Sequence, residues 1–141
     1  MAEFKLNIGD PNSKKTLKQS VEGDVAKKLI GKKIGSKISG DDLGYEGYEF
    51  EIKGGSDKAG FPMRRDVAGI SRKRILIVRG IGIRKNVAGR KKRRTVASNT
   101  VSELTSQINL KVTKTGKKPL FEEEKSAEED KSEDASSEKK E

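Results

Sequence analysis

The residues with the greatest chemical potential in this chain are its cations. Residues 64–94 contain 13 Lys and Arg but a single acid, Asp66. Nine of the 13 are Arg, whose planar guanidinium matches the oxygens of a phosphate better than an ammonium does. A net charge of +12 over 31 residues repels itself unless an anion neutralises it. The segment therefore predicts a polyphosphate partner, against the plainer reading of a solvated charged face.

We expect the nucleic-acid-binding residues to be the cations of this segment, together with one cation in the glycine-rich loop before it. They are Lys58, Arg64, Arg65, Arg72, Lys73, Arg74, Arg79, Arg84, Lys85, Arg90, Lys91, Lys92, Arg93 and Arg94. Residues 90–94 are five consecutive cations and are too polar for a core. We interpret them as part of a basic arm, residues 84–100, that becomes ordered on binding RNA. A localisation signal would have a similar composition.

The sequence offers little for catalysis. It contains no Cys and no His, which excludes disulfides, zinc sites built on these ligands, a Cys nucleophile and a His base. The carboxylate pair Asp41-Asp42 falls in an expected turn, and Gly80-Ile81-Gly82 lacks the third glycine of a dinucleotide-binding fingerprint. We expect no enzymatic activity, no metal, no cofactor and no small-molecule substrate.

Residues 54–63, GGSDKAGFPM, form a glycine-rich loop. Glycines permit positive φ and a close approach of the backbone, so such a loop can present N–H groups to phosphate. Pro62 restricts the residue before it to extended geometry and stiffens the loop. We favour Phe61 and Met63 as apolar plugs at the end of the core. The loop would then hold three cations outward: Lys58, Arg64 and Arg65.

The elements that must position these residues are mostly strands. Alternation of apolar and polar residues predicts half-buried strands over residues 4–8, 17–21, 48–53 and 108–112, the first two forming a hairpin. The apolar run 75–78 suits a strand buried on both faces, and residues 34–38 give a weaker strand. Gly54-Gly55 is expected to end the strand 48–53.

A short helix is expected from Asp24, as its N-cap, to a stop at Gly31. Together these elements predict a mainly β fold, a small and partly closed β-barrel of about six strands with one short helix. We assign residues 1–120 to this domain.

The charge is divided unevenly along the chain. Residues 1–121 hold 28 Lys and Arg against 12 Asp and Glu, whereas residues 122–141 hold 4 against 10. We expect residues 121–141 to be a disordered acidic tail. It would either fold back on residues 90–94 in the free protein or serve only as a solubilising segment. With no apolar signal segment and no apolar run longer than four residues, the sequence indicates a cytoplasmic protein without a membrane span.

The glycine-rich loop also carries a family resemblance. GGSDKAGFPM at residues 54–63 resembles the signature of the small-subunit ribosomal protein six family of archaea and eukaryotes. Residues 4–8 resemble that family's first strand, residues 43–53 the strand entering the signature, and residues 101–112 its closing strand. The resemblance covers the chain to about residue 118.

This resemblance implies a β-barrel protein of the small (30S) ribosomal subunit that binds 16S-type ribosomal RNA and contacts neighbouring small-subunit proteins. It also implies a cytoplasmic, ribosomal location and no enzymatic activity. Basic residues that touch RNA in the family match Lys58, Arg64, Arg65, Arg84, Lys85 and residues 90–94 here.

Two features depart from the family pattern. The basic arm commonly continues as Lys-x-Val-Arg-Gly, whereas this chain has Ala97-Ser98 in place of the final Arg-Gly. Eukaryotic members extend into a long basic helix, whereas this chain resembles the short archaeal form. The alternative function is a free-standing nucleic-acid chaperone or transcription-associated factor, which would not reside on 30S particles.

Overall fold

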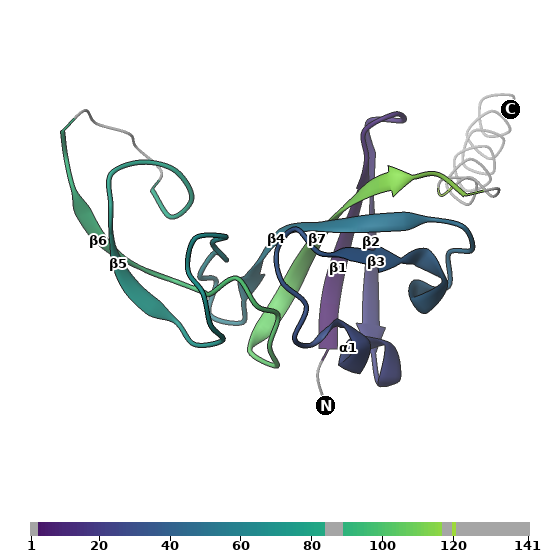
Figure 1. The fold of residues 1–141 in the computed structure, drawn as a ribbon, viewed down its shortest axis with the longest axis horizontal. Helices are drawn as coiled ribbons and strands as arrows, with labels where there is room; N and C mark the ends of the chain where they lie inside the picture. Colours follow the sequence, from purple (N-terminus) through teal and green to yellow (C-terminus); the bar gives the residue numbers. More distant parts are fainter. Residues whose placement is uncertain (1–2, 84–88, 117–119, 121–141) are drawn as a thin grey trace, which may run out of the picture.

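The fold is built from strands, and the computed structural model describes residues 3–83, 89–116 and 120 (Figure 1). The seven strands in these residues are β1 (Glu3–Asp10), β2 (Lys15–Glu22), β3 (Lys37–Ser39), β4 (Glu49–Asp57), β5 (Lys73–Ile77), β6 (Lys92–Val96) and β7 (Thr105–Lys114). The helices are α1 (Asp24–Leu29) and the 3₁₀ helix η1 (Gly40–Leu43). The expected mainly β fold with one short α-helix is confirmed. The expected acidic tail lies outside the described residues.

Five of the strands form one sheet in the order β2-β1-β7-β4-β3. All neighbours are antiparallel except β1 and β7, which run parallel with Leu6 opposite Ile108 and Ile8 opposite Leu110. Because side chains alternate between the two faces of a strand, this register places the apolar residues of all five strands on one face. That inner face forms the main core, in which Phe4, Leu6, Ile8, Phe50, Ile52 and Ile108 have no exposed surface.

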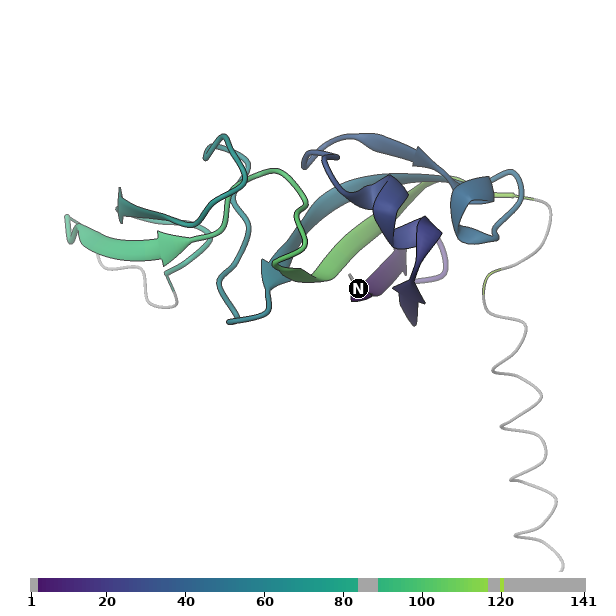
Figure 2. The ribbon, with the colours of Figure 1, turned by 90° about the horizontal axis from the view of Figure 1, so that it is seen from below.

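Helix α1 covers the inner face of the sheet (Figure 2). Ala26 and Leu29 are buried in the main core, and Gly31 follows the helix with a φ of 84° that suits a C-terminal stop. The expected helix is therefore confirmed, but Asp24 is not its N-cap. The cap position is Gly23, and Asp24 is the first helical residue, paired with Lys27 at 2.8 Å.

The sheet is not closed into the expected barrel. Helix α1 contacts β2 and η1, and η1 contacts β3, so these helices stand between the two edge strands. The weakly marked strand expected over residues 34–38 is shorter than predicted, since β3 retains Ile38 but not Ile34.

Strands β5 and β6 form a separate two-stranded ribbon that extends away from the large sheet (Figure 1). The prediction that residues 75–78 form a strand buried on both faces was wrong, because Leu76 is 57% exposed and Val78 is 45% exposed. A two-stranded ribbon has only one face that the rest of the chain can cover. That face contributes Ile77 and Val96 to a small second core with Val67.

Strand β4 continues through Gly54-Gly55, which was expected to end it, as far as Asp57. A register shift between Ile52 and Gly54 absorbs one residue as a bulge. A Cβ at Gly55 would lie inside van der Waals contact with the carbonyl oxygen of Gln107 on β7. Glycine therefore permits β4 and β7 to stay paired there, and it carries the strand directly into the glycine-rich loop.

We predict that Gly55→Ala lowers the free energy of unfolding by about 1–3 kcal/mol, because β7 must shift to accept the methyl group. Urea denaturation of the purified chain measures this loss. Gly9→Ala is the matched control, since a Cβ there meets only ordinary contacts at 3.8 Å. Equal stability of the two variants would contradict the close approach at Gly55.

Candidate nucleic-acid interface

The joint between the sheet and the ribbon is built on Asp57, the last residue of β4. Its side chain is 4% exposed and accepts a hydrogen bond from Nε of Arg72, just before β5. The Arg72 guanidinium also lies 5.2 Å from the centroid of the Phe61 ring. The backbone of Asp57 bonds the loop at both ends, its N–H donating to Phe61 and its carbonyl accepting from Gly60. One acidic side chain therefore fixes the loop and the start of the ribbon to the sheet.

The Arg72 hydrogen bond holds the pKa of Asp57 below its ordinary value of 3.8. The sequence did not predict this pair, although Asp57, the one acid of the glycine-rich loop, stands next to Lys58 and shortly before the basic segment, which was a usable signal. A lone carboxylate among many cations is expected to be ion-paired.

A second joint connects the end of β6 to the same loop. The N–H of Ala97 donates to the Pro62 carbonyl at 2.9 Å, and the N–H of Arg64 donates to the Ala97 carbonyl at 3.1 Å. Ser98 is 1% exposed, and its hydroxyl donates to the Ser71 carbonyl. The two residues that depart from the family pattern, Ala97 and Ser98, are thus part of the joint, and Ser98 is buried in it.

The two apolar residues of the loop have different surroundings. Met63 is 3% exposed and belongs to the main core, so its expected role as a plug is confirmed. Phe61 is only half-buried and lies beneath Arg72, so the same expectation was wrong for it. The aromatic ring is used to hold a cation rather than to fill the core.

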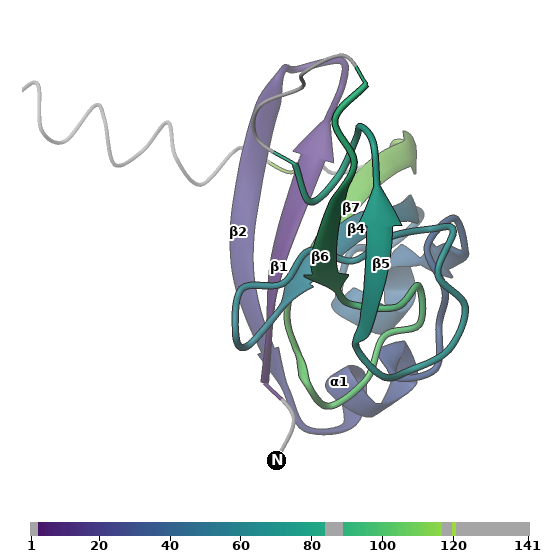
Figure 3. The same ribbon diagram turned by 90° about the vertical axis from the view of Figure 1, so that its left-hand side faces the viewer.

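Pairing within the ribbon sorts its cations between two faces. Arg74 lies opposite Thr95, and Leu76 lies opposite Arg93. Side chains alternate between the two faces of the ribbon, and Ile77 and Val96 point to the small second core. The pairs of Arg74 and Leu76 are one residue out of step with them and therefore occupy the opposite face. Alternation along the strands therefore directs Arg74 and Arg93 to the same uncovered face, and Figure 3 shows the two strands in front of the large sheet.

A groove of about 800 Å³ lies between this ribbon and the loop. Its lining includes Gly60, Phe61 and Pro62 from the loop and Gly82 and Ile83 beyond β5. The ribbon contributes Thr95 and four cations, Arg74, Lys92, Arg93 and Arg94. No acid lines this basic groove, and none of its four cations makes an ion pair within the described part of the chain.

Two of the predicted contact residues are used within the fold instead. Arg64 was expected to face outward, but its side chain is 17% exposed, pairs with Asp66 and donates to the Ile81 carbonyl at 3.1 Å. Arg72 is held by Asp57. A third predicted contact residue, Lys73, is exposed, although its ammonium donates to the Ala68 carbonyl at 2.9 Å.

The remaining predicted contact residues are open to solvent or lie outside the structure. Exposed and without ion pairs in the described residues are Lys58, Arg65, Arg79, Arg90 and Lys91. Arg84 and Lys85 lie outside the described residues. The basic arm expected to order only on RNA binding is partly a strand, because residues 92–96 pair with β5 and Val96 is buried.

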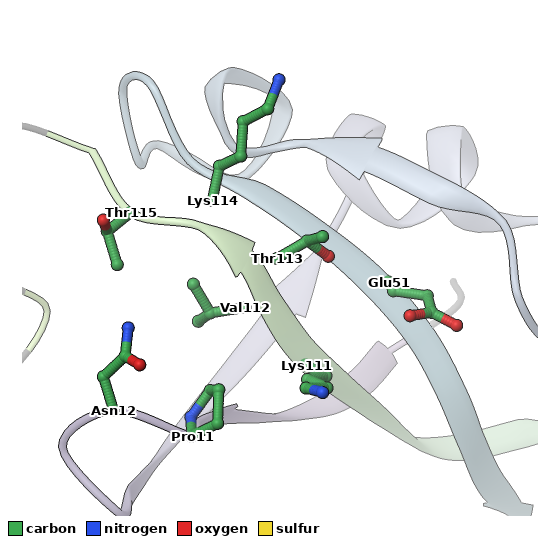
Figure 4. Close-up of a pocket in the computed structure, with 8 residues that line it drawn as sticks. All are labelled: Pro11, Asn12, Glu51, Lys111, Val112, Thr113, Lys114 and Thr115. Carbon is green, nitrogen blue, oxygen red and sulfur yellow. The ribbon is translucent and has the colours of Figure 1, made fainter.

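A second hollow, of about 460 Å³, lies at the far end of β7 (Figure 4). It is polar rather than basic, since Glu51 lines it beside Lys111 and Lys114. Within the described residues there is no group of three or more possible metal ligands among His, Cys, Asp and Glu. The same residues contain no helix long and apolar enough to cross a membrane.

The family model of ribosomal protein S6e matches residues 4–124 of this chain. The chain belongs to the ribosomal protein S6e family. The expected kinship with the small-subunit ribosomal protein six family is thereby confirmed. The match includes both joints and the basic groove.

Named relatives agree with this assignment. A protein of Methanoculleus marisnigri called small ribosomal subunit protein eS6 is 42% identical over 122 residues, covering 86% of this chain and 92% of the relative. The protein of that name from Archaeoglobus fulgidus is 44% identical, covering 85% and 94%. The one from Haloarcula marismortui is 40% identical over 116 residues, covering 82% and 90%. This S6e chain is thus similar to archaeal relatives over nearly their whole length.

We predict that Arg72→Ala destabilises the S6e chain while Arg74→Ala, the matched control, leaves its stability nearly unchanged. Removing Arg72 leaves the buried Asp57 carboxylate without its donor, and an unsatisfied buried group costs about 1–3 kcal/mol. Arg74 makes no ion pair with any residue in the described ranges, so its removal leaves no carboxylate behind there. Urea denaturation of both variants tests the difference, and equal midpoints would contradict the joint.

The same pair predicts a pH dependence. Because the folded pKa of Asp57 is lowered from 3.8, its stabilising contribution is complete above that value and is lost as the pH falls through the folded pKa. Asp57→Asn should therefore be less stable at neutral pH but lose stability less steeply on acidification. Denaturation midpoints of both proteins between neutral pH and about pH 2 measure this. Parallel curves would show that the carboxylate is not ion-paired in solution.

Proposed function

We propose that this chain is a structural constituent of the small ribosomal subunit and binds 16S-type rRNA through the basic groove. The observation that carries the proposal is the groove itself, which combines four cations with a glycine-rich loop and in which no cation has an acidic partner among the described residues. Guanidinium and ammonium groups that are not neutralised by a carboxylate attract a polyphosphate backbone. The relatives' printed name, small ribosomal subunit protein, supports the choice of RNA and of particle.

The mechanism is neutralisation of phosphate charge by a rigid platform. The ribbon is fixed to the sheet by both joints before RNA arrives, so little conformational entropy is lost on binding. Exposed cations outside the groove extend the basic surface; they are Lys58, Arg65, Arg79, Arg90 and Lys91. In this proposal residues 1–120 form the rRNA-binding domain, residues 84–100 its basic arm, and neighbouring small-subunit proteins its other contacts. Neutralising about eight phosphates corresponds to a log–log salt slope of roughly −6 to −7.

We predict that Arg93→Gln/Arg94→Gln weakens binding to 16S-type rRNA and reduces the steepness of the salt slope by about one per arginine. Filter binding at several salt concentrations gives both values. The matched control is Lys27→Gln/Lys28→Gln, which removes the same two charges from α1. An equal loss in the control would show that net charge, rather than the groove, determines binding.

Whether the chain is bound to small ribosomal subunits in the cell or is free distinguishes this function from that of a free-standing nucleic-acid chaperone. Tagged chain should sediment through a sucrose gradient stoichiometrically with the small subunit and remain there at moderate salt. Chain that stays at the top of the gradient at low and high salt would overturn the ribosomal proposal.

A further inference from the structure

The outer face of the large sheet, opposite α1, carries three neighbouring amide side chains. Asn7 on β1 donates from Nδ2 to Oδ1 of Asn109 on β7 at 3.2 Å. Gln107 donates from Nε2 to the same oxygen at 2.9 Å. These bonds align the three amides at the solvent-exposed centre of the sheet, and each amide retains donor or acceptor capacity for a ligand.

Two glycines keep this face flat. Gly9 lies opposite Lys111, and Gly54 lies opposite Asn109. Neither glycine has a φ in the left-handed region; a Cβ at Gly54 would meet nothing within 4 Å, and one at Gly9 only ordinary contacts. Glycine weakens a strand interior, and the fold requires it at neither position. Its presence is explained if another molecule approaches the backbone there.

The charge on this face favours an anionic ligand. Lys5, Lys18 and Lys111 surround the amides, and none of the three makes an ion pair within the described residues. Of the acids on this face, Glu51 is paired with Lys53 at 2.8 Å, whereas Glu3 and Glu22 lie opposite each other beyond Lys5 and make no ion pair within the described residues. A phosphate that approaches the amides would therefore meet three lysines, of which Lys111 also lies opposite Glu51.

The chemistry of the face also distinguishes RNA from a protein partner. The exposed large apolar residues of the described chain are Ile70, Leu76, Val78, Ile81 and Leu104, and none of them lies on the five strands of this sheet. Protein interfaces normally have an apolar centre, which is missing here. No aromatic side chain is exposed on these strands either, so bases have nothing to stack on. Amides and lysines on a flat surface instead suit the 2′-hydroxyls and phosphates of an RNA double helix.

We propose that the outer face, defined by Lys5, Asn7, Gly9, Lys18, Gly54, Gln107, Asn109 and Lys111, is a second RNA-docking surface that binds the shallow minor groove of a double helix. The inference rests on the proposed function, because it assumes an RNA-binding protein. It adds a surface on the large sheet, which lies apart from the ribbon of β5 and β6 (Figure 1), whereas the basic groove is lined by that ribbon and the loop. The chain would thereby hold two segments of RNA at once.

A size series at Gly54 tests the outer face. Gly54→Ala and Gly54→Leu should leave the Tm at or above that of the unchanged chain, because a Cβ at Gly54 meets nothing within 4 Å and the position faces the outer side of the sheet. Binding is measured to a 20-base-pair RNA duplex and to a DNA duplex of the same sequence. Gly54→Leu should weaken RNA binding roughly tenfold, the loss of one or two hydrogen bonds, with Gly54→Ala in between. The preference for RNA over DNA should fall in the same order.

Asn109→Ala provides a second variant, since it removes the acceptor shared by Asn7 and Gln107 without adding bulk. It should lower RNA-duplex affinity and leave DNA-duplex affinity nearly unchanged. Arg93→Gln/Arg94→Gln should lower both affinities and the salt slope.

The outcomes separate the two proposals. RNA-duplex binding that is unchanged in both Gly54→Leu and Asn109→Ala would overturn the proposal that the outer face binds RNA. It would not affect the proposal that the basic groove binds rRNA. Binding of 16S-type rRNA without any binding of the duplex would also overturn it. Failure of the unchanged chain to bind 16S-type rRNA at low salt would overturn the proposed function itself.

Discussion

The ribbon keeps its position relative to the sheet because one buried carboxylate is ion-paired. Asp57 ends β4, fixes the loop through its backbone and holds Arg72 through its side chain. A two-stranded ribbon has little stability of its own in water. Its small core of Val67, Ile77 and Val96 is sufficient only when the ribbon is anchored at its base. The position of the cations in the basic groove therefore depends on this acid, which holds the start of β5, together with the backbone bonds of Ala97 at the end of β6.

This arrangement divides the cations into two classes that composition does not distinguish. Arg64 and Arg72 are neutralised by Asp66 and Asp57 and hold the backbone in place. Arg74, Arg93 and Arg94 have no such partners among the residues that the structure describes, and a charge without a partner at a surface is available to a ligand. Asp57 and Asp66 are thus placed where they order the scaffold, and no acid is found among the described residues that line the groove.

The sequence predicted the large sheet well because alternation of apolar and polar residues is strong in β1, β4 and β7. The helix was also located, since Gly31 is a clear stop. The ribbon was misjudged because an apolar run such as residues 75–78 has the same appearance in a buried strand and in a two-stranded ribbon. Only long-range pairing with β6 determines which of the two it is.

The site was only partly predictable for a related reason. The sequence identifies which residues are cations, but the pairing of Arg72 with Asp57 spans 15 positions and follows from the path of the loop. Gly54 and Gly55 are adjacent and identical in type, yet one is enclosed by β7 and the other faces open space. No local pattern separates them, because the difference is created by a neighbouring strand that is distant in sequence.

The position of β7 has a consequence for how the protein is made. This strand is the last in the described chain, yet it lies at the centre of the sheet between β1 and β4. The hairpin of β1 and β2 is synthesised first. The edge of β1 that pairs with β7 stays unpaired until residues 105–114 have been synthesised. Non-local pairing of this kind forms slowly. The large sheet therefore gains its central strand only after the whole basic segment, residues 64–94, has been synthesised.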